Sequence, residues 1–232
     1  MTAFGSLLGH DARLQFRYGI YYAYAFVVGF YVVTIWSLGA ALPGWFVGLL
    51  IYTDPAVVGF FFLGALMMLE KSEGVRAALG ITPMTASDYF WAKTVTLSTL
   101  SVVAVLAMSV ALHKGANLLV LLPTVFLTSV FYLGIGVQVT RLFSTVTSYL
   151  MGSMLVLLPI VLPAGLAFIP DMPIWAMLVP TAAQFKLILI GTNFGDAAFG
   201  EIVLMLTVSV VGAVASVAVA QRSLKADFGR AK

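Results

Sequence analysis

The sequence contains no cysteine among its 232 residues and only two histidines. The absence of cysteine excludes disulfide bonds and thiolate metal sites. His10 and His113 lie far apart in the sequence, so they do not support a metal site either. Only 9% of the residues are charged, whereas about 25% are charged in an average soluble domain. This shortage of charge excludes an ordinary soluble domain.

Motifs for nucleotide binding and hydrolysis are also missing. The chain has no G-x-x-x-x-G-K-[S/T] loop of the kind that holds nucleotide phosphates. Its one notable glycine pair, Gly134 and Gly136, lies inside an apolar run. No serine, histidine and acidic residue form a catalytic set. The net charge of +3 comes from cations spread over the flanks of apolar segments, a pattern that does not favour nucleic acid.

Apolar residues make up 62% of the chain and gather in runs long enough to cross a bilayer. One crossing needs about 20 such residues. We therefore expect an all-α integral membrane fold with six transmembrane helices in a single domain, residues 1–232. The expected spans are Ile20–Leu38, Trp45–Leu69, Thr94–Leu112, Leu118–Thr140, Tyr149–Phe168 and Ile202–Ala220.

The segment Ile174–Gly195 leaves the number of spans open, because Pro180 and Lys186 interrupt it. A seventh crossing there would place the two termini on opposite sides of the membrane. The distribution of cations favours six spans, since cytoplasmic loops are rich in lysine and arginine. Six spans place Lys114 and Lys186 outside. They place the other ten cations inside: Arg13, Arg17, Lys71, Arg76, Lys93, Arg141, Arg222, Lys225, Arg230 and Lys232. We therefore expect both termini in the cytoplasm and a re-entrant outer segment over residues 170–198.

Two further segments are expected at the inner surface. Residues 1–17 mix apolar side chains with Arg13 and Arg17, which suits a helix lying in the interface. The alternative is an ordinary basic flank of the first span. Residues 221–232 form a basic cytoplasmic tail.

The loop between the second and third spans has helical character. Charged and apolar residues alternate from Glu70 to Leu79, and Gly80 and Pro83 then end the pattern. Thr85 and Asp88 have the spacing of a capping box that starts the next helix. The composition leaves two interpretations open: a surface helix on which a partner docks, or a solvated loop whose charges fix the topology.

Asp54 is the one carboxylate well inside an apolar run, and Pro55 should kink or loosen the helix beside it. Ionisable residues in a membrane usually face an interior or a wet cavity. The functional interpretation is a polar point in a substrate path or outer gate. The structural interpretation is a pair with an outer cation such as Lys186, or a helix cap if the span begins at Asp54.

Prolines and small residues mark two other spans. Pro159 and Pro163 lie four apart and weaken the hydrogen-bond ladder on one face, which would allow an element of the substrate path to bend. The alternative is a static kink. Gly212, Ser216 and Ala220 also recur at a spacing of four and predict close helix packing within the subunit.

Several motifs together resemble the ABC-2 type exporter permeases. The motifs are Gly59–Gly64 (GFFFLG), Glu70–Gly74 (EKSEG), Leu79–Pro83 (LGITP) and Asp88–Lys93 (DYFWAK). The resemblance is specific over residues 59–93. Elsewhere it is general and rests on six spans, an amphipathic N-terminal helix and a broken outer segment. The amino-acid sequences of these motifs most resemble those of small permeases of the fluoroquinolone-exporter type.

The resemblance implies that residues 70–80 form a coupling helix that docks on a separate ATPase. The coupling residues would be Glu70, Lys71, Glu73, Gly74, Arg76, Leu79 and Pro83. It also implies a cell-membrane complex of two ATPase copies with a second copy of this permease or a homologous one. ATP and magnesium would bind the ATPase, and this chain would need no cofactor.

The complex would export an amphipathic or hydrophobic substrate. Two other functions stay open: a membrane scaffold or assembly factor, and a lipid-modifying membrane enzyme. The enzyme would need polar residues gathered at one depth, whereas Asp54 and Gln138 are scattered.

Overall fold

The computed structural model describes residues 3–39, 41–74 and 85–230, which contain helices and no strand. Six helical segments are long and apolar enough to cross a membrane. They are Ile20–Leu38, Gly44–Ser72, Ala86–Val110, Leu118–Leu142, Val146–Phe168 and Phe199–Asp227. The predicted fold class, an all-α membrane protein with six spans, is therefore confirmed.

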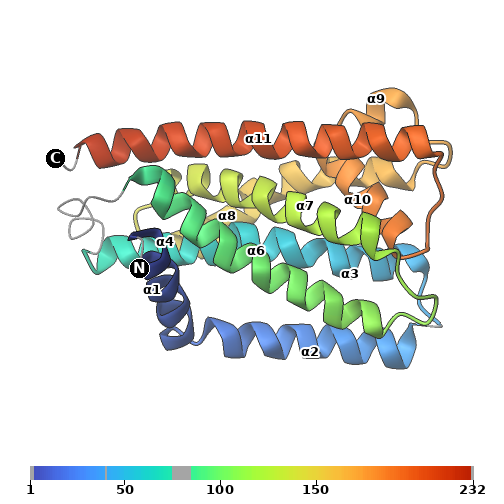
Figure 1. Cartoon of the computed structure of the whole chain (residues 1–232), viewed down its shortest axis with the longest axis horizontal. Coiled ribbons are helices and arrows are strands. Elements are labelled where there is room, and N and C mark those ends of the chain that lie inside the picture. The colour runs from blue at the N-terminus through green and yellow to red at the C-terminus, as the bar shows by residue number, and fades with distance from the viewer. Residues whose placement is uncertain (1–2, 40, 75–84, 231–232) are drawn as a thin grey trace.

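The spans run side by side along the long axis of the molecule (Figure 1). Helix α7 (Leu118–Val139) packs against α6 (Ala86–Val110), α10 (Pro180–Gly191) and α11 (Phe199–Arg230). The start of α1 (Ala3–Arg17) and the end of α11 lie at one end of the bundle, called the terminal end below. The two termini thus lie on the same side, as six spans require.

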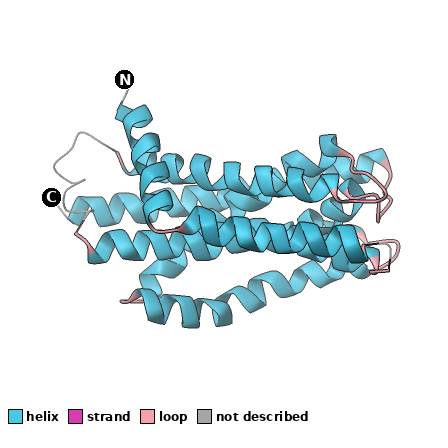
Figure 2. Cartoon of the chain, turned by 90° about the horizontal axis from the view of Figure 1, so that it is seen from below, coloured by secondary structure: helices cyan, strands magenta, loops and turns pink. Residues whose placement is uncertain are grey.

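Helix α1 runs crosswise to the spans in both views (Figures 1 and 2). It ends at a left-handed turn, with φ of 71° at Gly19, and α2 (Ile20–Leu38) follows directly. A crosswise helix at the end of a bundle has the direction that an interfacial helix needs. The placement of α1 on a membrane surface stays a prediction.

The second span changes its helical type along its length. It starts as α3 (Gly44–Val57), widens into a π-helix over Val58–Phe62, and continues as α4 (Leu63–Ser72). Pro55 lies one turn before the π-helix and has no N–H for the hydrogen-bond ladder. The predicted loosening after Asp54 is therefore present, and it falls mainly on Val58–Phe62.

Glycines let the π-helix approach α7 closely. A Cβ atom built on Gly59 would lie 3.0 Å from the backbone oxygen of Ser129 and 3.0 Å from the backbone nitrogen of Leu133. One built on Gly136 would lie 2.9 Å from the backbone oxygen of Gly59. Backbone atoms cannot move aside as a side chain can, so the pair of glycines fixes the spacing of these two spans.

We expect Gly59→Ala to destabilise the protein by about 1–3 kcal/mol, the usual range for overpacking a tight site. Thermal unfolding in detergent measures the effect. Gly165→Ala is the matched control, because no described atom lies within 4 Å of a Cβ built there. Equal unfolding temperatures for the two variants would contradict the close approach.

Capping boxes begin two of the spans. The Thr85 hydroxyl accepts a hydrogen bond from the Asp88 N–H, and Asp88 accepts one from the Thr85 N–H, both at 3.1 Å. This predicted capping box is confirmed and starts α6 at Ala86, well before the apolar part of the span. Thr145 and Ser148 form a second box at the start of α8 (Val146–Val161).

The fifth span loosens between its two prolines. Pro159 lies in the last turn of α8, and Pro163 lies in a 3₁₀-helix over Leu162–Phe168 that continues the span. The helix therefore changes pitch at the place where the ladder was expected to weaken. Whether this part of the span moves stays a prediction.

The segment Ile174–Gly195 contains two short helices, α9 (Ile174–Met177) and α10, and neither is long enough to span. A seventh crossing is thus absent from the described part of the chain. A Cβ built on Gly212 of α11 would lie 3.0 Å from Pro180, so α10 begins against the interior of α11. It ends at the opposite end of the bundle, where the Asn117 N–H donates to the Gly191 carbonyl at 2.7 Å.

The small-residue face of the last span packs within the subunit, as predicted. Gly212 faces Pro180, a Cβ on Gly134 of α7 would lie 2.6 Å from the Ser216 hydroxyl, and Ala220 is fully buried. Helix α11 also continues into the predicted basic tail, as far as Arg230. In this extension, Asp227 forms a surface ion pair of 3.5 Å with Arg141 in the short 3₁₀-helix Thr140–Leu142.

Candidate functional site

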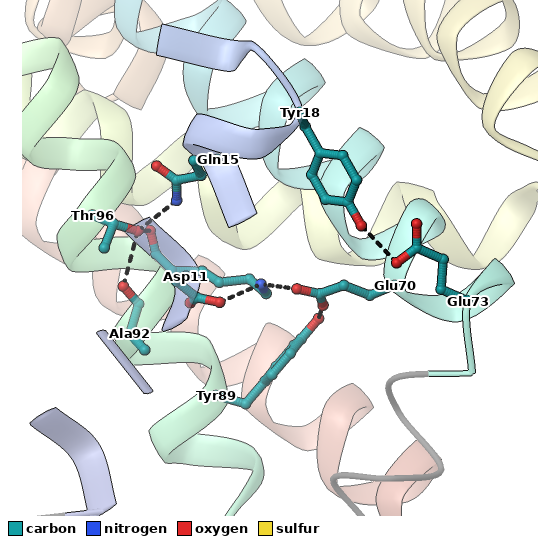
Figure 3. A network of polar contacts seen from close by, with 9 residues as sticks. Asp11, Gln15, Tyr18, Glu70, Glu73, Tyr89, Ala92 and Thr96 are labelled. Carbon is teal, nitrogen blue, oxygen red and sulfur yellow. Dashed lines mark hydrogen bonds and ion pairs between the residues drawn. The ribbon is translucent and has the colours of Figure 1, made fainter. Parts of the chain in front are cut away.

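A buried lysine joins three helices at the terminal end. The Lys93 amine of α6 lies 2.5 Å from Glu70 Oε1 of α4 and 3.1 Å from Asp11 Oδ1 of α1. The three side chains are at most 2% exposed. The Tyr89 hydroxyl donates to Glu70 Oε2, and the Lys93 amine lies 4.8 Å from the centre of the Tyr89 ring (Figure 3). We call these four residues the Lys93 cluster.

The Lys93 cluster holds two carboxyl groups against one ammonium group. Asp11 Oδ2 is buried and has no hydrogen-bond partner in the described part of the chain. Burial raises the pKa of the Asp11 carboxyl above its usual value, and Lys93 acts against this rise. A proton on Asp11 would leave Lys93 and Glu70 as a neutral pair. That arrangement avoids an uncompensated buried charge, which is costly.

Two further contacts attach α1 and its end to the bundle (Figure 3). The Gln15 amide donates to the Thr96 hydroxyl of α6 at 2.9 Å. The Tyr18 hydroxyl donates to Glu73 Oε2 at 2.7 Å, just after α4. Partial burial and the neighbouring Glu73 carboxylate raise the pKa of Tyr18 to about 12, so this donor stays protonated at neutral pH.

The structure describes four of the seven predicted coupling residues. Helix α4 ends at Ser72, and Gly74 takes a positive φ of 71°, so one continuous helix from Glu70 to Leu79 is wrong. Glu70, which was predicted as a coupling residue, is buried against Lys93 and does not share an exposed surface with Glu73. Lys71, Glu73 and Gly74 are exposed. The remaining predicted coupling residues, Arg76, Leu79 and Pro83, lie outside the described residues.

Asp54 lies inside the bundle on α3. Because α3 begins at Gly44, the helix-cap interpretation is wrong. Asp54 is 3% exposed, and both of its carboxylate oxygens lie 2.8 Å from the hydroxyl of Tyr24 on α2. In the part of the chain that the structure describes, its partner is therefore a tyrosine rather than Lys186.

The two span-five prolines lie apart from Asp54 in the fold. Pro159 is exposed on the outside of the bundle and Pro163 is half-buried. An apolar groove of about 380 Å³ runs between α3 and α8, lined by residues that include Tyr52, Met154 and Leu158. Neither proline is among its lining residues. The structure therefore gives no contact that joins the prolines to the carboxylate.

The sequence contained signals for the residues that were missed. Tyr89 and Lys93 are four apart on one helix and belong to the quoted DYFWAK motif, but their partners come from elsewhere in the chain. Tyr24 stood among the span-one aromatics, most of which suit lipid contact. No group of three metal-ligating side chains occurs within residues 3–39, 41–74 and 85–230.

Comparisons with known proteins agree with this architecture. Residues 2–230 match the model of the fluoroquinolones export permease protein family. Two proteins named fluoroquinolones export permease protein are each 28% identical over 179 residues, which is 76% of this chain and 74% of each relative. They come from Mycobacterium tuberculosis strains CDC 1551 / Oshkosh and ATCC 25618 / H37Rv.

The comparison with solved structures gives no match. The family match is consistent with the ABC-2 type permease that the motifs of residues 59–93 resemble. It covers nearly the whole chain, and the six helices make that chain a multi-pass membrane protein. The chain therefore belongs to the fluoroquinolones export permease protein family.

Proposed function

We propose that this permease is the membrane subunit of an ATP-driven ABC exporter of amphipathic or hydrophobic compounds, fluoroquinolones among them. The family match over residues 2–230 carries the proposal. The chain has no nucleotide-binding loop of its own. A separate ATPase chain would therefore bind ATP and magnesium, and two such chains would work below two permeases in the cell membrane.

The contacts at the terminal end support such coupling. The end of α4, where the loop toward α6 begins, is tied to α6 and α1 through Lys93. A force applied after α4 would thus act on three helices at once. ATP would favour the outward-open state because the ATPases bind it more tightly in that state, which is how a ligand shifts such an equilibrium.

Transport in inside-out vesicles tests the proposal. The permease is co-expressed with a candidate ABC ATPase subunit from the same genome, and uptake of norfloxacin is followed by its own fluorescence. We expect uptake that requires ATP, with loss of uptake when the phosphate-binding lysine of the ATPase is replaced. Uptake driven by a proton gradient without ATP would contradict the proposal. An absence of any transport would favour a scaffold or assembly factor.

Orientation gives a separate prediction. Single cysteines at Ala116 and Asp196 should react with an impermeant thiol reagent added outside whole cells, and one at Lys225 should not. The loops after α6 and after α10, which hold Ala116 and Asp196, lie at the end of the bundle opposite the end of α11, which holds Lys225. The cation distribution places Lys225 inside. The chain has no native cysteine, so no background labelling arises. Labelling of Lys225→Cys from outside would contradict the predicted topology.

A further inference from the structure

Asp54 is a membrane-embedded carboxylate without a cation. It lies about 15 Å along the helix from the start of α3 and about 27 Å from the end of α4. The hydrocarbon core is about 30 Å thick, so a segment of about 42 Å that crosses it keeps Asp54 inside the core. The salt bridges of the described residues involve Lys93 and Arg141 and do not reach Asp54. Ionisable groups at such a depth are rare and usually serve a ligand or a pathway.

Tyr24 separates Asp54 from an apolar groove between α2 and α6. The groove has a volume of about 440 Å³, and its lining includes Tyr21, Tyr24, Gly29, Leu100 and Ala107. Small-molecule sites usually measure about 300–1,000 Å³. Tyr24 is 6% exposed, and its hydroxyl is the donor to Asp54. The tyrosine therefore forms the wall between the groove and the carboxylate.

A second polar group, the Ser101 hydroxyl, lies beside the pair of Tyr24 and Asp54. The Ser101 hydroxyl of α6 is fully buried and makes no hydrogen bond of ordinary length within the described residues. It lies close enough to Asp54 and Tyr24 to interact with both. A buried hydroxyl normally has a partner. Asp54 and Ser101 together thus offer acceptors for more N–H or O–H donors than Tyr24 supplies.

We propose that the groove between α2 and α6, with Asp54 and Ser101 behind the Tyr24 side chain that lines it, binds amphipathic substrates through a protonated amine. The apolar body of the substrate lies between the two helices. Its ammonium group takes the place of the Tyr24 hydroxyl at Asp54 and donates a further hydrogen bond to Ser101. This inference rests on the proposed export function and names the substrate class of that function: cationic amphiphiles.

The occupant is a solute amine rather than the ammonium headgroup of a lipid. A headgroup lies at the membrane surface, whereas Asp54 lies about 15 Å along the helix from the nearer end of its span. The groove wall is almost wholly apolar, and Asp54, held by Tyr24, is a single acidic group behind it. One cationic group on an apolar body is the chemistry that complements this arrangement.

Binding to the purified full chain in phosphatidylcholine nanodiscs, without ATPase or ATP, tests the site. The probes are norfloxacin, which has a basic piperazine nitrogen, and N-acetylnorfloxacin, in which acetylation removes that basicity. Fluorescence anisotropy gives both dissociation constants. We expect the wild type to bind norfloxacin at least about tenfold more tightly than N-acetylnorfloxacin. In Asp54→Asn, the ratio of the two dissociation constants should fall below about threefold. Tyr24→Phe should keep the preference, because it removes only the competing hydroxyl.

Two further variants and a lipid exchange complete the test. Gly29→Leu fills the groove without touching Asp54, since no described atom lies within 4 Å of a Cβ at Gly29. This variant should weaken the binding of both norfloxacin and N-acetylnorfloxacin. Met154→Phe, in the other groove between α3 and α8, should change neither dissociation constant. Exchanging part of the phosphatidylcholine for phosphatidylethanolamine should leave the ratio unchanged.

Several outcomes would overturn the site. They are a wild type that does not bind norfloxacin, a wild-type ratio near one, a ratio that survives in Asp54→Asn, and displacement of norfloxacin by phosphatidylethanolamine. If Asp54→Asn does not fold, unchanged binding by Gly29→Leu overturns the site instead. These binding measurements need no ATPase, so they can succeed even where ATP-driven export fails. A failure of the site and a failure of the proposed export function are therefore distinguishable.

Discussion

Replacing Lys93 by methionine should destabilise the protein by about 3–5 kcal/mol, the usual cost of removing one partner from a buried ion pair. Methionine keeps much of the length of lysine but leaves Glu70 and Asp11 buried with no cation beside them. Because these residues belong to α6, α4 and α1, the terminal end should lose its order first. Thermal unfolding in detergent and the yield of monodisperse protein measure the effect.

Matched variants separate the buried pair from a general loss of charge. Lys71→Met removes an exposed lysine at the same end and should change stability by less than about 0.5 kcal/mol. Asp11→Asn should cost less than Glu70→Gln, because burial already favours the neutral form of Asp11. Combining Lys93→Met with Glu70→Gln and Asp11→Asn should restore part of the loss. An unfolding temperature of Lys93→Met equal to that of Lys71→Met would refute the Lys93 cluster.

The features that the sequence predicted well depend on local patterns. Apolar runs gave the six spans, and the Thr85–Asp88 spacing gave the start of α6. Pro55 indicated a loosened helix, and the small residues Gly212 and Ser216 indicated close packing. In each case the neighbours along the chain determine the result, so no knowledge of the fold is needed.

The roles of the acidic residues could not be predicted in the same way. Glu70 and Glu73 are three apart in one charged motif, yet one is buried against Lys93 and the other is exposed beside Tyr18. The difference depends on partners 23 and 55 residues away in sequence. For the same reason, Tyr24 could not be chosen as the partner of Asp54 from among the aromatic residues of the first span.

This division changes how the coupling proposal is tested. A variant that includes Glu70 would damage the Lys93 cluster and would say little about docking. Glu73 and Gly74 are exposed where α4 gives way to the loop, so they can be altered without disturbing the buried pair. The residues that follow, including Arg76 and Leu79, keep their predicted role in docking.

We expect Gly74→Trp and Glu73→Arg each to weaken binding of the ATPase about 30-fold or more while the permease stays folded. Interface hot spots cost about 2 kcal/mol or more, and each 1.4 kcal/mol is about a factor of ten in affinity. Titration of the ATPase onto permease in nanodiscs gives the affinity, and substrate-stimulated ATP hydrolysis gives the coupling. Both measurements should fall together if this surface is the docking site.

The opposite end of the bundle supplies the control for Gly74. Gly115 also has a left-handed backbone, with φ of 69° against 71° at Gly74, and no described atom lies within 4 Å of a Cβ at either glycine. Gly115→Trp therefore has a similar backbone strain but should leave ATPase binding unchanged.

Tyr18→Phe separates the two roles of Glu73, because it removes the 2.7 Å hydrogen bond and keeps the carboxylate. If Tyr18→Phe weakens binding as much as Glu73→Arg, Glu73 acts by holding α1 in place. If Gly74→Trp binds the ATPase as tightly as Gly115→Trp, the surface after α4 is not the docking site, and its charges serve only the topology.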